Sequence, residues 1–389
     1  MDTILSTPLG NLDIRIVSDQ LDAVPSRLMR PIRILVDSFA DEGALNAQMT
    51  NAREIISRLD PERFHVSTFV LGTPDIRLVQ RPETRLIRLP QRRQTPRILK
   101  EFIWGDHDIL FYVKASPAAK IYLKFRTKWI DKRAVIGTVE SQSDLRNEPT
   151  IKPEQVRLWE QTVLRSDFLF SNSSSVRASL KKEYGLSSEV VPTGVDTKFF
   201  TPAWDRPANE RLRVLFVGGL RPFKGPQLLV QAAAQFPTLD FVIIGEGMLR
   251  LELDRRVKEQ RLKNVQFTGS LDPASLREQY RQADVFLFPS RWEGSPKVIL
   301  EASACGLPVI ARKDYQPETV VDGATGYLGS SDDELLDRLK SLTGNPELRR
   351  DKGRAARAHS ERFDWDLITR RWEEIFLRLA PQGRSTGPS

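Results

Sequence analysis

The sequence has little of several residues that define whole classes of protein. Its 389 residues include one cysteine, Cys305, and three histidines, His65, His107 and His359. One cysteine cannot form an internal disulfide, so a disulfide-stabilised secreted scaffold is excluded. A zinc cluster of cysteines and histidines is excluded as well. No run of about 18 apolar residues occurs, so the sequence predicts no membrane-spanning helix.

The N-terminus also lacks the features of a secretory signal. Asp2 comes early, and no apolar core follows a basic region in the first twelve residues. We therefore expect a cytoplasmic protein.

Positive charge is present in excess. The chain has 59 Lys and Arg against 51 Asp and Glu, a net charge of +8, while 40% of its residues are hydrophobic and 28% are charged. The composition is that of a soluble globular protein, and the length predicts two domains. The excess charge suits three kinds of partner: nucleic acid, an anionic membrane surface or a phosphorylated substrate.

Short apolar runs rich in Val, Ile and Leu alternate with segments long enough for crossover helices. Such runs are typical of strands buried on both faces of a parallel sheet. In the first half we expect strands at 32–39, 65–71, 85–89, 109–113, 135–139, 168–171 and 190–191, with helices at 45–59 and 175–183. In the second half we expect strands at 214–217, 240–244, 265–268, 285–288 and 309–311, with helices at 225–235, 249–260, 273–283 and 296–305.

A polar, proline-containing stretch at 201–210 separates these two arrays and is typical of a linker. Two βαβ arrays in tandem predict an α/β protein with two Rossmann-like domains, 31–203 and 211–362, that face each other across a cleft. We expect 1–30 to be a tail with one short strand at 12–17, and 381–389 to be disordered. An amphipathic helix is expected at 364–380, beginning at Asp364, which suits a helix start better than a metal site.

The segment from Val285 to Glu301 carries the first candidate site. A buried strand ends near Pro289, a loop carries Glu293 and Gly294, and Ser295 and Pro296 suit the N-cap and first helical position of the next helix. The free backbone amides of 295–298 can therefore accept an anion.

Two further loops have the same character. Val217 to Gly225 follows a strand and contains Arg221 and Lys224, which can place positive charge on a phosphate. The second loop contains Gly43 and follows the first expected strand of the N-terminal half, 32–39. Alone, each glycine is more typical of a tight turn than of a binding loop.

Together, these segments form an ordered set that resembles the retaining glycosyltransferases of family four, which have the GT-B fold. The matching motifs are Val191–Asp196, Val217–Leu220 with Lys224-Gly225, Gly245-Glu-Gly247 with Arg250, Val265–Gly269, Asp284–Ser290, Glu293-Gly294 to Glu301, Cys305–Val309, Glu318 and Gly323–Gly326. The terminal Phe363–Asp366 segment also matches, and in that family the last helix packs back on the N-terminal domain. The first half matches only in architecture.

The resemblance implies a role for each matched position. Glu293 would lie beside the donor sugar, Glu301 would bind the ribose hydroxyls, and Lys224 would stabilise the leaving diphosphate. Donor contacts would also come from Gly43, Gly218, Gly219, Gly269, Ser270, Leu271, Gly294, Ser295, Pro296, Lys297 and Val298. In such an enzyme these groups can replace a divalent metal, so we expect no metal and no cofactor, with the nucleotide-sugar as a substrate.

The sequence departs from the family at two places. Gly219 stands where the family usually has an arginine, and Arg221, two residues on, is the candidate replacement. Many members have a histidine near the donor sugar after the fifth N-terminal strand, where this chain has Glu140. Glu318 is open to two interpretations, a loop cap or a residue facing the cleft.

The charge excess is concentrated between Arg77 and Arg133, which contains 15 basic and five acidic residues. Within it, 119–130 is helical in pattern, with Lys120, Lys124 and Lys128 on one face and Tyr122, Leu123, Phe125 and Trp129 as apolar contacts. Two interpretations are open: a helix lying on an anionic membrane, or a solvated helix whose aromatic residues enter the core.

The sequence thus predicts a retaining glycosyltransferase that moves a sugar from a UDP- or GDP-sugar to a hydroxyl of a sugar, lipid or other glycoconjugate, in the synthesis of cell-envelope polysaccharide or glycolipid. An anionic membrane surface is an expected partner, with peripheral attachment at the cytoplasmic face, and nucleic acid is not. The alternatives are a GT-B phosphorylase and a catalytically silent subunit that binds a sugar nucleotide. A Rossmann dehydrogenase is disfavoured, because no Gly-x-Gly-x-x-Gly motif follows a strand.

Overall fold

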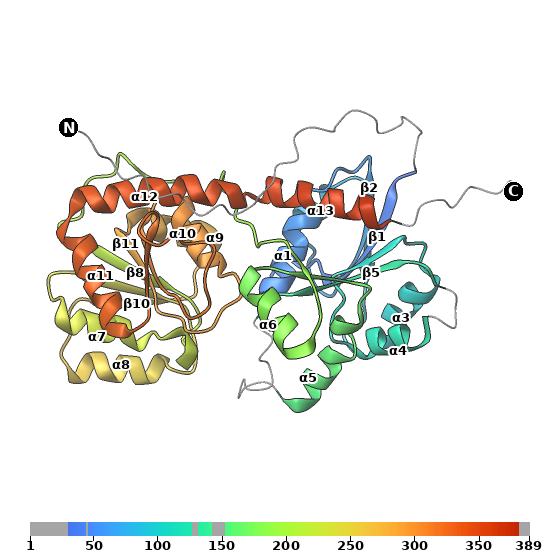
Figure 1. Cartoon of the computed structure of the whole chain (residues 1–389), viewed down its shortest axis with the longest axis horizontal. Helices are drawn as coiled ribbons and strands as arrows, with labels where there is room; N and C mark the ends of the chain where they lie inside the picture. The colour runs from blue at the N-terminus through green and yellow to red at the C-terminus, as the bar shows by residue number, and fades with distance from the viewer. Residues whose placement is uncertain (1–29, 44–45, 127–130, 142–151, 381–389) are drawn as a thin grey trace, which may run out of the picture.

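The chain forms two parallel sheets, each covered by helices. The structure, a computed structural model, describes residues 30–43, 46–126, 131–141 and 152–380. The first sheet has seven strands and the second has six (Figure 1). All strands of the first sheet precede residue 203 and all strands of the second follow residue 211, although the domain limits themselves stay a prediction.

In the first sheet the strand order is β3-β2-β1-β4-β5-β6-β7, and neighbouring strands are parallel. The strands are β1 (Ile32–Phe39), β2 (Phe64–Val70), β3 (Thr84–Arg88), β4 (Ile109–Phe111), β5 (Ala134–Val139), β6 (Phe168–Ser171) and β7 (Glu189–Val190). The helices are α1 (Ala47–Ile56), α2 (Ile76–Gln80), α3 (Thr95–Trp104), α4 (Pro117–Phe125), α5 (Pro153–Glu160) and α6 (Ser174–Tyr184).

In the second sheet the strand order is β10-β9-β8-β11-β12-β13, again parallel. The strands are β8 (Arg213–Val217), β9 (Asp240–Ile244), β10 (Val265–Gly269), β11 (Val285–Phe288), β12 (Val309–Arg312) and β13 (Gly326–Gly329). The helices are α7 (Gln227–Gln235), α8 (Arg250–Glu259), α9 (Pro273–Gln282), α10 (Lys297–Ala304), α11 (Asp332–Gly344), α12 (Pro346–Ser360) and α13 (Trp365–Leu379).

The strands are apolar along their whole length because both faces of each sheet are buried. In β1, Ile34 and Val36 belong to one hydrophobic cluster, and Leu35, between them, belongs to another on the opposite face. Successive side chains of a strand point to opposite faces, so continuous apolar runs are what such a sheet requires. This is why the sequence pattern located most strands to within one or two residues.

The last helix joins the two domains. α12 lies over the second sheet and α13 continues from it across to the first (Figure 1). Trp365, Trp372 and Phe376 of α13 are buried in the core of the first domain, where the Phe376 ring lies 4.9 Å from that of Phe111. Asp364 caps this helix by accepting from the amide of Asp366 at 2.8 Å. The return of the last helix to the first domain, expected from the resemblance, is confirmed.

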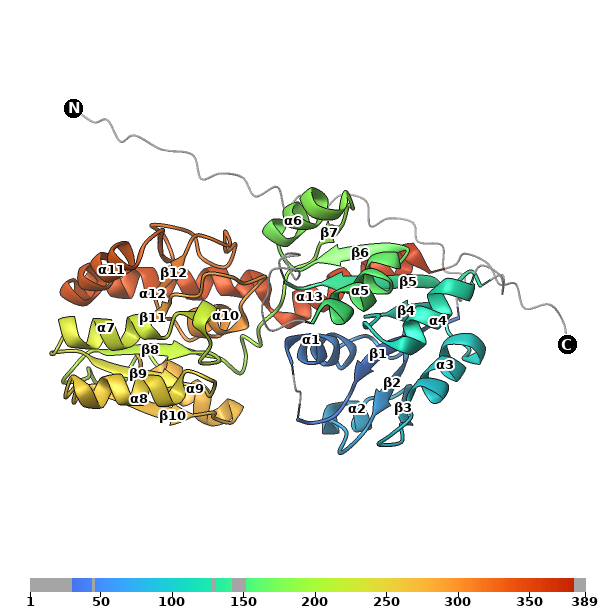
Figure 2. The same cartoon turned by 90° about the horizontal axis from the view of Figure 1, so that it is seen from below.

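The carboxyl ends of the two sheets face each other. A Cβ placed on Gly294, in the loop after β11, would lie 2.1 Å from the carbonyl oxygen of Glu140, which directly follows β5. Figure 2 shows the loops of the two domains meeting at this junction. Loops at these ends hold the ligands of doubly wound sheets, so the predicted site residues lie where such a fold binds its substrates.

The predicted helix at 119–130 is only partly as expected. α4 ends at Phe125, Tyr122 is buried, and its hydroxyl donates to Asp131 at 2.7 Å. Tyr122 therefore packs in the core, where its ring meets Phe102, and is not an interfacial contact. Lys128, Trp129, the expected strand at 12–17 and the tails 1–29 and 381–389 lie outside the described residues. Within the part of the chain that is described, no helix has the length and apolar character needed to cross a bilayer.

Candidate functional site

Two predicted site residues, Lys224 and Glu293, form an ion pair at the junction. Lys224 ends a short 3-10 helix, Pro222–Lys224, that follows β8, and Glu293 lies in the loop after β11. Because β8 and β11 are neighbours in the sheet, their loops meet. The hydroxyl of Ser290 donates to the same Glu293 oxygen at 2.6 Å. Both charged side chains are largely buried, so a charged ligand that enters here meets a preformed site.

Arg221 occupies space beside Gly219. Its Nε lies 3.8 Å, and its Cγ 3.9 Å, from the position that a Cβ on Gly219 would take. Arg221 is exposed, and within the described residues its guanidinium makes no ion pair. A guanidinium starting two residues later therefore reaches the place where a side chain at 219 would begin.

Glu301 lies in the second turn of α10 and is held by a buried tyrosine. The hydroxyl of Tyr280 donates to its Oε2 at 2.9 Å, which leaves Oε1 free of protein donors within the described residues. Burial raises the pKa of Glu301, with the charge of Lys297 acting in the opposite direction. A carboxylate with one free oxygen can accept a hydrogen bond from a ligand hydroxyl.

The start of α10 is one residue later than the sequence predicts. Pro296, not Ser295, is the N-cap residue, and no side chain caps the helix. The ψ of Pro296 is 114°, an extended conformation, so Lys297 becomes the first helical residue. The first backbone amides of α10 thus have no partner inside the helix, and they point toward the junction.

The other predicted donor residues of the second domain lie around two close backbone contacts. Gly245, with a φ of 131°, packs so tightly on Gly218 that a Cβ would lie 2.1 Å from the Gly218 carbonyl oxygen. Gly269 has a φ of 74° and accepts a hydrogen bond from the amide of Gly245 at 2.9 Å. Ser270 and Leu271 follow directly. The structure brings these loops together at the carboxyl end of β8, β9 and β10.

Gly43 lies apart from these residues, in the first domain. It lines a cavity of about 450 Å³ at the carboxyl end of β1 and β4, together with Phe39, Asp41, Lys114 and Trp159. A Cβ on Gly43 would have no neighbour within 4 Å. Gly43 therefore borders open space on the first domain's side of the junction.

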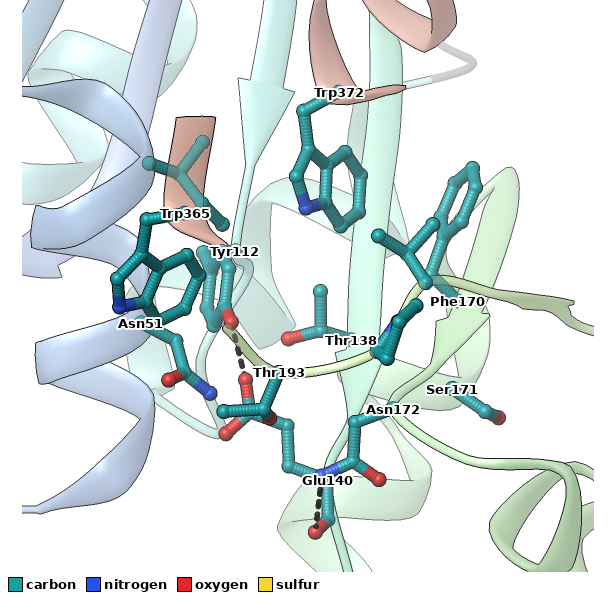
Figure 3. A pocket seen from close by; sticks show the side chains of 13 residues that line it. Asn51, Tyr112, Thr138, Glu140, Phe170, Ser171, Asn172, Thr193, Trp365 and Trp372 are labelled. Carbon is teal, nitrogen blue, oxygen red and sulfur yellow. Dashed lines mark hydrogen bonds between the residues drawn. The ribbon is translucent and has the colours of Figure 1, made fainter. Parts of the chain in front are cut away.

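Glu140, at the position where the resemblance implies a histidine, points into the first domain (Figure 3). Its carboxylate accepts from the hydroxyl of Tyr112, and its backbone carbonyl accepts from the side-chain amide of Asn172 at 3.0 Å. Burial raises the pKa of Glu140. Its carboxylate faces a cavity of about 20 Å³, which has room for one water molecule.

Four buried polar atoms around that cavity have no hydrogen-bond partner within the described residues. They are Glu140 Oε2, Asn51 Oδ1, Asn172 Oδ1 and Thr193 Oγ1. Buried polar atoms of this kind are usually satisfied, so an ordered water fits this cavity. The arrangement orients Glu140 away from the junction and makes it a poor candidate for direct contact with a donor sugar.

Within residues 30–43, 46–126, 131–141 and 152–380, no three His, Cys, Asp or Glu side chains come together as a metal site would require.

Comparison with known proteins identifies the family. A model described as "Glycosyl transferases group 1" matches residues 202–359. A D-inositol 3-phosphate glycosyltransferase of Corynebacterium jeikeium is 30% identical over 289 residues, which cover 67% of this chain and 68% of that protein. The chain belongs to the group 1 glycosyl transferases. A second D-inositol 3-phosphate glycosyltransferase, of Acidothermus cellulolyticus, is 35% identical over 236 residues, about half the length of each protein.

Solved structures share the fold of this glycosyltransferase. A sucrose-phosphate synthase of Thermosynechococcus elongatus matches with a TM-score of 0.72 at 22% identity, over 90% of this chain and 99% of that one. HepE of Anabaena, solved in complex with UDP and glucose, matches with a TM-score of 0.71 at 17% identity, over 90% of this chain and all of that one. These matches confirm the GT-B fold, an α/β fold of two Rossmann-like domains.

Sequence reasoning missed several residues of the glycosyltransferase site. Tyr280, Tyr112 and Ser290 donate to Glu301, Glu140 and Glu293, and of these three donors only Ser290 lies within a matching motif, Asp284–Ser290. Tyr280 and Tyr112 reach their partners from other elements, whereas Ser290 and Glu293 share the loop after β11. Glu318 is now assigned: its Oε1 accepts from the amide of Ser174 at 2.8 Å, so it caps α6 of the other domain.

Proposed function

We propose that this glycosyltransferase moves a sugar from a UDP- or GDP-sugar to an acceptor hydroxyl with retention of anomeric configuration. The observation that carries the proposal is a set of three groups. They are the Lys224–Glu293 ion pair, the first backbone amides of α10, which no side chain caps, and the carboxylate of Glu301, whose Oε1 has no protein donor within the described residues. Lys224 and the amides suit the diphosphate, Glu293 suits the sugar, and Glu301 suits the ribose of one donor. The UDP and glucose bound in the structure of HepE support the donor class.

Charge develops on the diphosphate as the sugar leaves. A lysine already in place, together with backbone amides, stabilises that charge without reorganisation in the transition state. Glu293 orients the Lys224 ammonium before the donor binds, and Arg221 supplies a second cation at the exposed side. We propose that these groups do the work of a divalent metal in this protein.

The acceptor is proposed to attack from the same face that the diphosphate leaves. The bond between the anomeric carbon and the diphosphate oxygen breaks, the acceptor oxygen bonds to that carbon, and the hydroxyl proton passes to the departing diphosphate. Neither carboxylate nearby suits a nucleophile, because Glu293 is engaged by Lys224 and Ser290, and Glu140 points into the first domain. A trapped covalent glycosyl-enzyme would contradict this mechanism.

The cavity of about 450 Å³ beside Gly43 is the proposed acceptor site. Its size suits a small ligand, and its walls combine the aromatic rings of Phe39 and Trp159 with the polar groups of Asp41 and Lys114. Lys114 Nζ lies 4.0 Å from the centre of the Phe39 ring. Aromatic rings with polar groups at the rim suit a ring that bears hydroxyls, such as the sugar of an envelope polysaccharide or glycolipid.

Peripheral attachment to an anionic membrane is also proposed. Much of the basic excess is paired inside the first domain, as with Arg77 on Glu54 and Arg133 on Asp131. Six exposed basic residues without an ion pair, within the described residues, lie on α3, α4 and the loop before α3: Arg92, Arg93, Arg97, Lys100, Lys120 and Lys124. Trp104 is 73% exposed at the end of α3, and Ile121 is exposed on α4. This combination suits an anionic lipid surface.

Co-sedimentation with phosphatidylglycerol vesicles tests the membrane proposal. We expect binding at low salt that falls as salt is added, and at least about tenfold weaker binding for Lys120→Glu with Lys124→Glu, because each basic residue contributes about 1 kcal/mol near an anionic surface. Lys258→Glu, an exposed change on α8, is the control. If the wild-type protein ignores these vesicles at low salt, the membrane proposal fails and the enzyme assignment stands.

Thermal unfolding with UDP, GDP and ADP tests the donor proposal. A nucleotide at about 100 times its Kd stabilises the folded state by about 2.7 kcal/mol, so the true nucleotide should raise the melting temperature most. Inorganic diphosphate should do so less, because it lacks the ribose that Glu301 would bind. No response to any of the three would count against a nucleotide-sugar donor. Sugar release that needs inorganic phosphate would instead favour a phosphorylase.

Moving the arginine from position 221 to position 219 tests whether Arg221 supplies the charge of the arginine that the family usually has at 219. Arg221→Ala should lower kcat about tenfold, because a charged hydrogen bond contributes about 1.5–3 kcal/mol. Gly219→Arg combined with Arg221→Ala should restore most of the rate, since a Cβ at 219 would have no neighbour closer than 3.8 Å. Gly218→Arg with Arg221→Ala is the matched control, because its Cβ would point at Phe216, 3.2 Å away. If neither double variant recovers the kcat lost in Arg221→Ala, the proposal that Arg221 replaces an arginine at 219 is contradicted.

A further inference from the structure

An arginine of α1 holds the loop after β1 through the carbonyl groups of that loop. Arg53 Nη1 donates to the backbone carbonyl of Asp41 at 2.8 Å and to that of Glu42 at 2.8 Å. Hydrogen bonds from a charged donor are stronger than those between neutral groups. One guanidinium nitrogen therefore fixes two successive peptide groups, the second of which joins Glu42 to Gly43.

This contact sets the direction of the Gly43 amide. The described residues contain no cis peptide, and in a planar trans peptide the N–H points opposite to the C=O. Because the Glu42 carbonyl points at Arg53, the Gly43 amide points away from Arg53. Within the described residues that amide donates to no protein acceptor, and Gly43 lines the cavity at the end of β1. The loop thus presents a backbone donor whose direction is set before a ligand arrives.

The other side of the loop is tied to the segment after β2. The Glu42 amide donates to the carbonyl of Thr73 at 2.8 Å, so this neighbouring amide is already used. The carboxylate of Asp41 accepts from the amide of Leu71 at 3.1 Å. The position of the loop is therefore fixed from two sides, by Arg53 and by the segment after β2.

Arg53 is itself oriented by buried ion pairs. Its Nε lies 3.1 Å from Oδ2 of Asp75, the N-cap residue of α2, and its side chain is only 11% exposed. Arg77 pairs with Asp75 at 2.9 Å and with Glu54 at 2.7 Å. Burial acts to raise the pKa of Asp75, but hydrogen bonds from Arg77 and the charges of Arg77 and Arg53 hold it below its ordinary value. Asp75 therefore stays charged at neutral pH and keeps Arg53 in place.

The loop faces the start of α10 in the other domain. It leads into α1, and Lys297, the first residue of α10, donates to the carbonyl of Ala47, the first residue of α1, at 3.1 Å. The Gly43 amide and the first amides of α10 thus lie on the two sides of one junction. Since Gly43 also lines the proposed acceptor cavity, its amide suits the distal phosphate of a donor, which carries the sugar to be transferred.

We propose that Arg53 is a positioning residue for sugar transfer: by binding the carbonyls of Asp41 and Glu42, it orients the Gly43 amide to donate to the distal phosphate as the sugar leaves. The inference rests on the proposed function for the identity of this anion. Arg53 acts through the loop and does not touch the substrate. An amide already in place stabilises the developing charge without reorganisation in the transition state.

Isothermal titration with a nucleoside diphosphate and the matching monophosphate tests the proposal, with the base that gives the largest thermal shift. Arg53→Met should weaken diphosphate binding about tenfold, the effect of losing one hydrogen bond to a charged group, and leave monophosphate binding within about twofold. Arg53→Lys should keep most of the preference for the diphosphate. A single nitrogen makes both bonds to the loop, and an ammonium can donate to two carbonyls as well.

Arg58→Met is the matched control. Arg58 directly follows α1, is largely buried and pairs with Glu54 and Asp196, but it binds no carbonyl of the loop. The change should therefore leave the ratio of diphosphate to monophosphate affinity as in the wild type. A lower melting temperature shared by Arg58→Met and Arg53→Met would measure the structural part of losing a buried arginine.

Variants of Gly43 show whether Arg53 acts through its amide. Gly43→Pro removes the amide hydrogen, while Gly43→Ala keeps it and adds a Cβ that has no neighbour within 4 Å. Gly43→Pro should lose the preference for the diphosphate, and Gly43→Ala should keep it. Arg53→Met combined with Gly43→Pro should bind both nucleotides as Gly43→Pro does, because two changes that remove the same interaction are not additive.

The outcomes separate this inference from the proposed function. If the folded Arg53→Met variant loses affinity for both nucleotides equally, or for neither, the inference is overturned, while nucleotide binding by the wild type leaves the proposed function standing. If Arg53→Met does not fold, equal affinity ratios in Gly43→Pro and Gly43→Ala overturn the inference. If the wild type binds neither nucleotide, the proposed function fails, and the inference fails with it.

Discussion

Lys224→Met is expected to lower kcat about 100- to 1000-fold, the range found when a preorganised group that stabilises transition-state charge is removed. Lys224 is held beside Glu293 before any ligand arrives, so its position costs nothing at the moment of reaction. Its charge matters most when the diphosphate departs, because the leaving group then carries more negative charge than in the bound donor. Steady-state kinetics with the donor found by thermal shift measures the effect.

The matched control is Lys258→Met, the same change at an exposed position on α8. It should leave kcat unchanged. A rise in KM with an unchanged kcat in Lys224→Met would mean that Lys224 binds ground state and transition state equally, which contradicts the proposed role. Circular dichroism and the melting temperature separate lost chemistry from lost folding.

Gly294→Ala should lower turnover about 100-fold or more while nucleoside diphosphate binding stays within tenfold of the wild type. A Cβ at this position would lie 2.1 Å from the carbonyl oxygen of Glu140 and 2.9 Å from Oδ1 of Asn172, both on the other domain. Neither atom can yield easily, because Asn172 also donates to that carbonyl. The domains would be held apart, and a displacement of about 1 Å can cost a factor of 100 in rate.

Gly344→Ala is the control for this variant, since a Cβ there would have no neighbour within 4 Å. Isothermal titration with the nucleotide and initial rates with the full donor give the two quantities. A parallel loss of nucleotide affinity and turnover would show that Gly294 contacts the donor directly and that the contact with Glu140 is not what limits the rate.

The sequence located the strands well because both faces of each sheet are buried. Continuous apolar runs such as 285–288 have few alternatives, and β11 has the predicted bounds. Boundaries set by local backbone geometry were less certain: the extended ψ of Pro296 moved the start of α10, and α4 is shorter than the predicted 119–130 helix. The amphipathic pattern of that helix did not show which aromatic side chain would enter the core.

The site, too, contains some residues that the sequence could identify and others that only the structure reveals. Lys224 and Glu293 could be singled out because each lies in a loop that follows a strand, and parallel strands bring such loops together, whereas Glu301 was singled out by the resemblance to the family. Tyr280, the partner of Glu301, comes from α9 and follows only from packing. Glu140 could be identified as a departure from the family, but its direction depends on Tyr112, which directly follows β4.

The sequence by itself determined the α/β architecture, the order of the elements and the family, because these depend on periodic burial and on loops close to strand ends. Only the tertiary structure decided that Glu140 points away from the junction, that Glu318 caps α6 and that Lys297 reaches Ala47. Each of these contacts joins residues from different elements, and most join the two domains. Their geometry is fixed by how α13 and the strand-end loops pack, and no local run of residues encodes that packing.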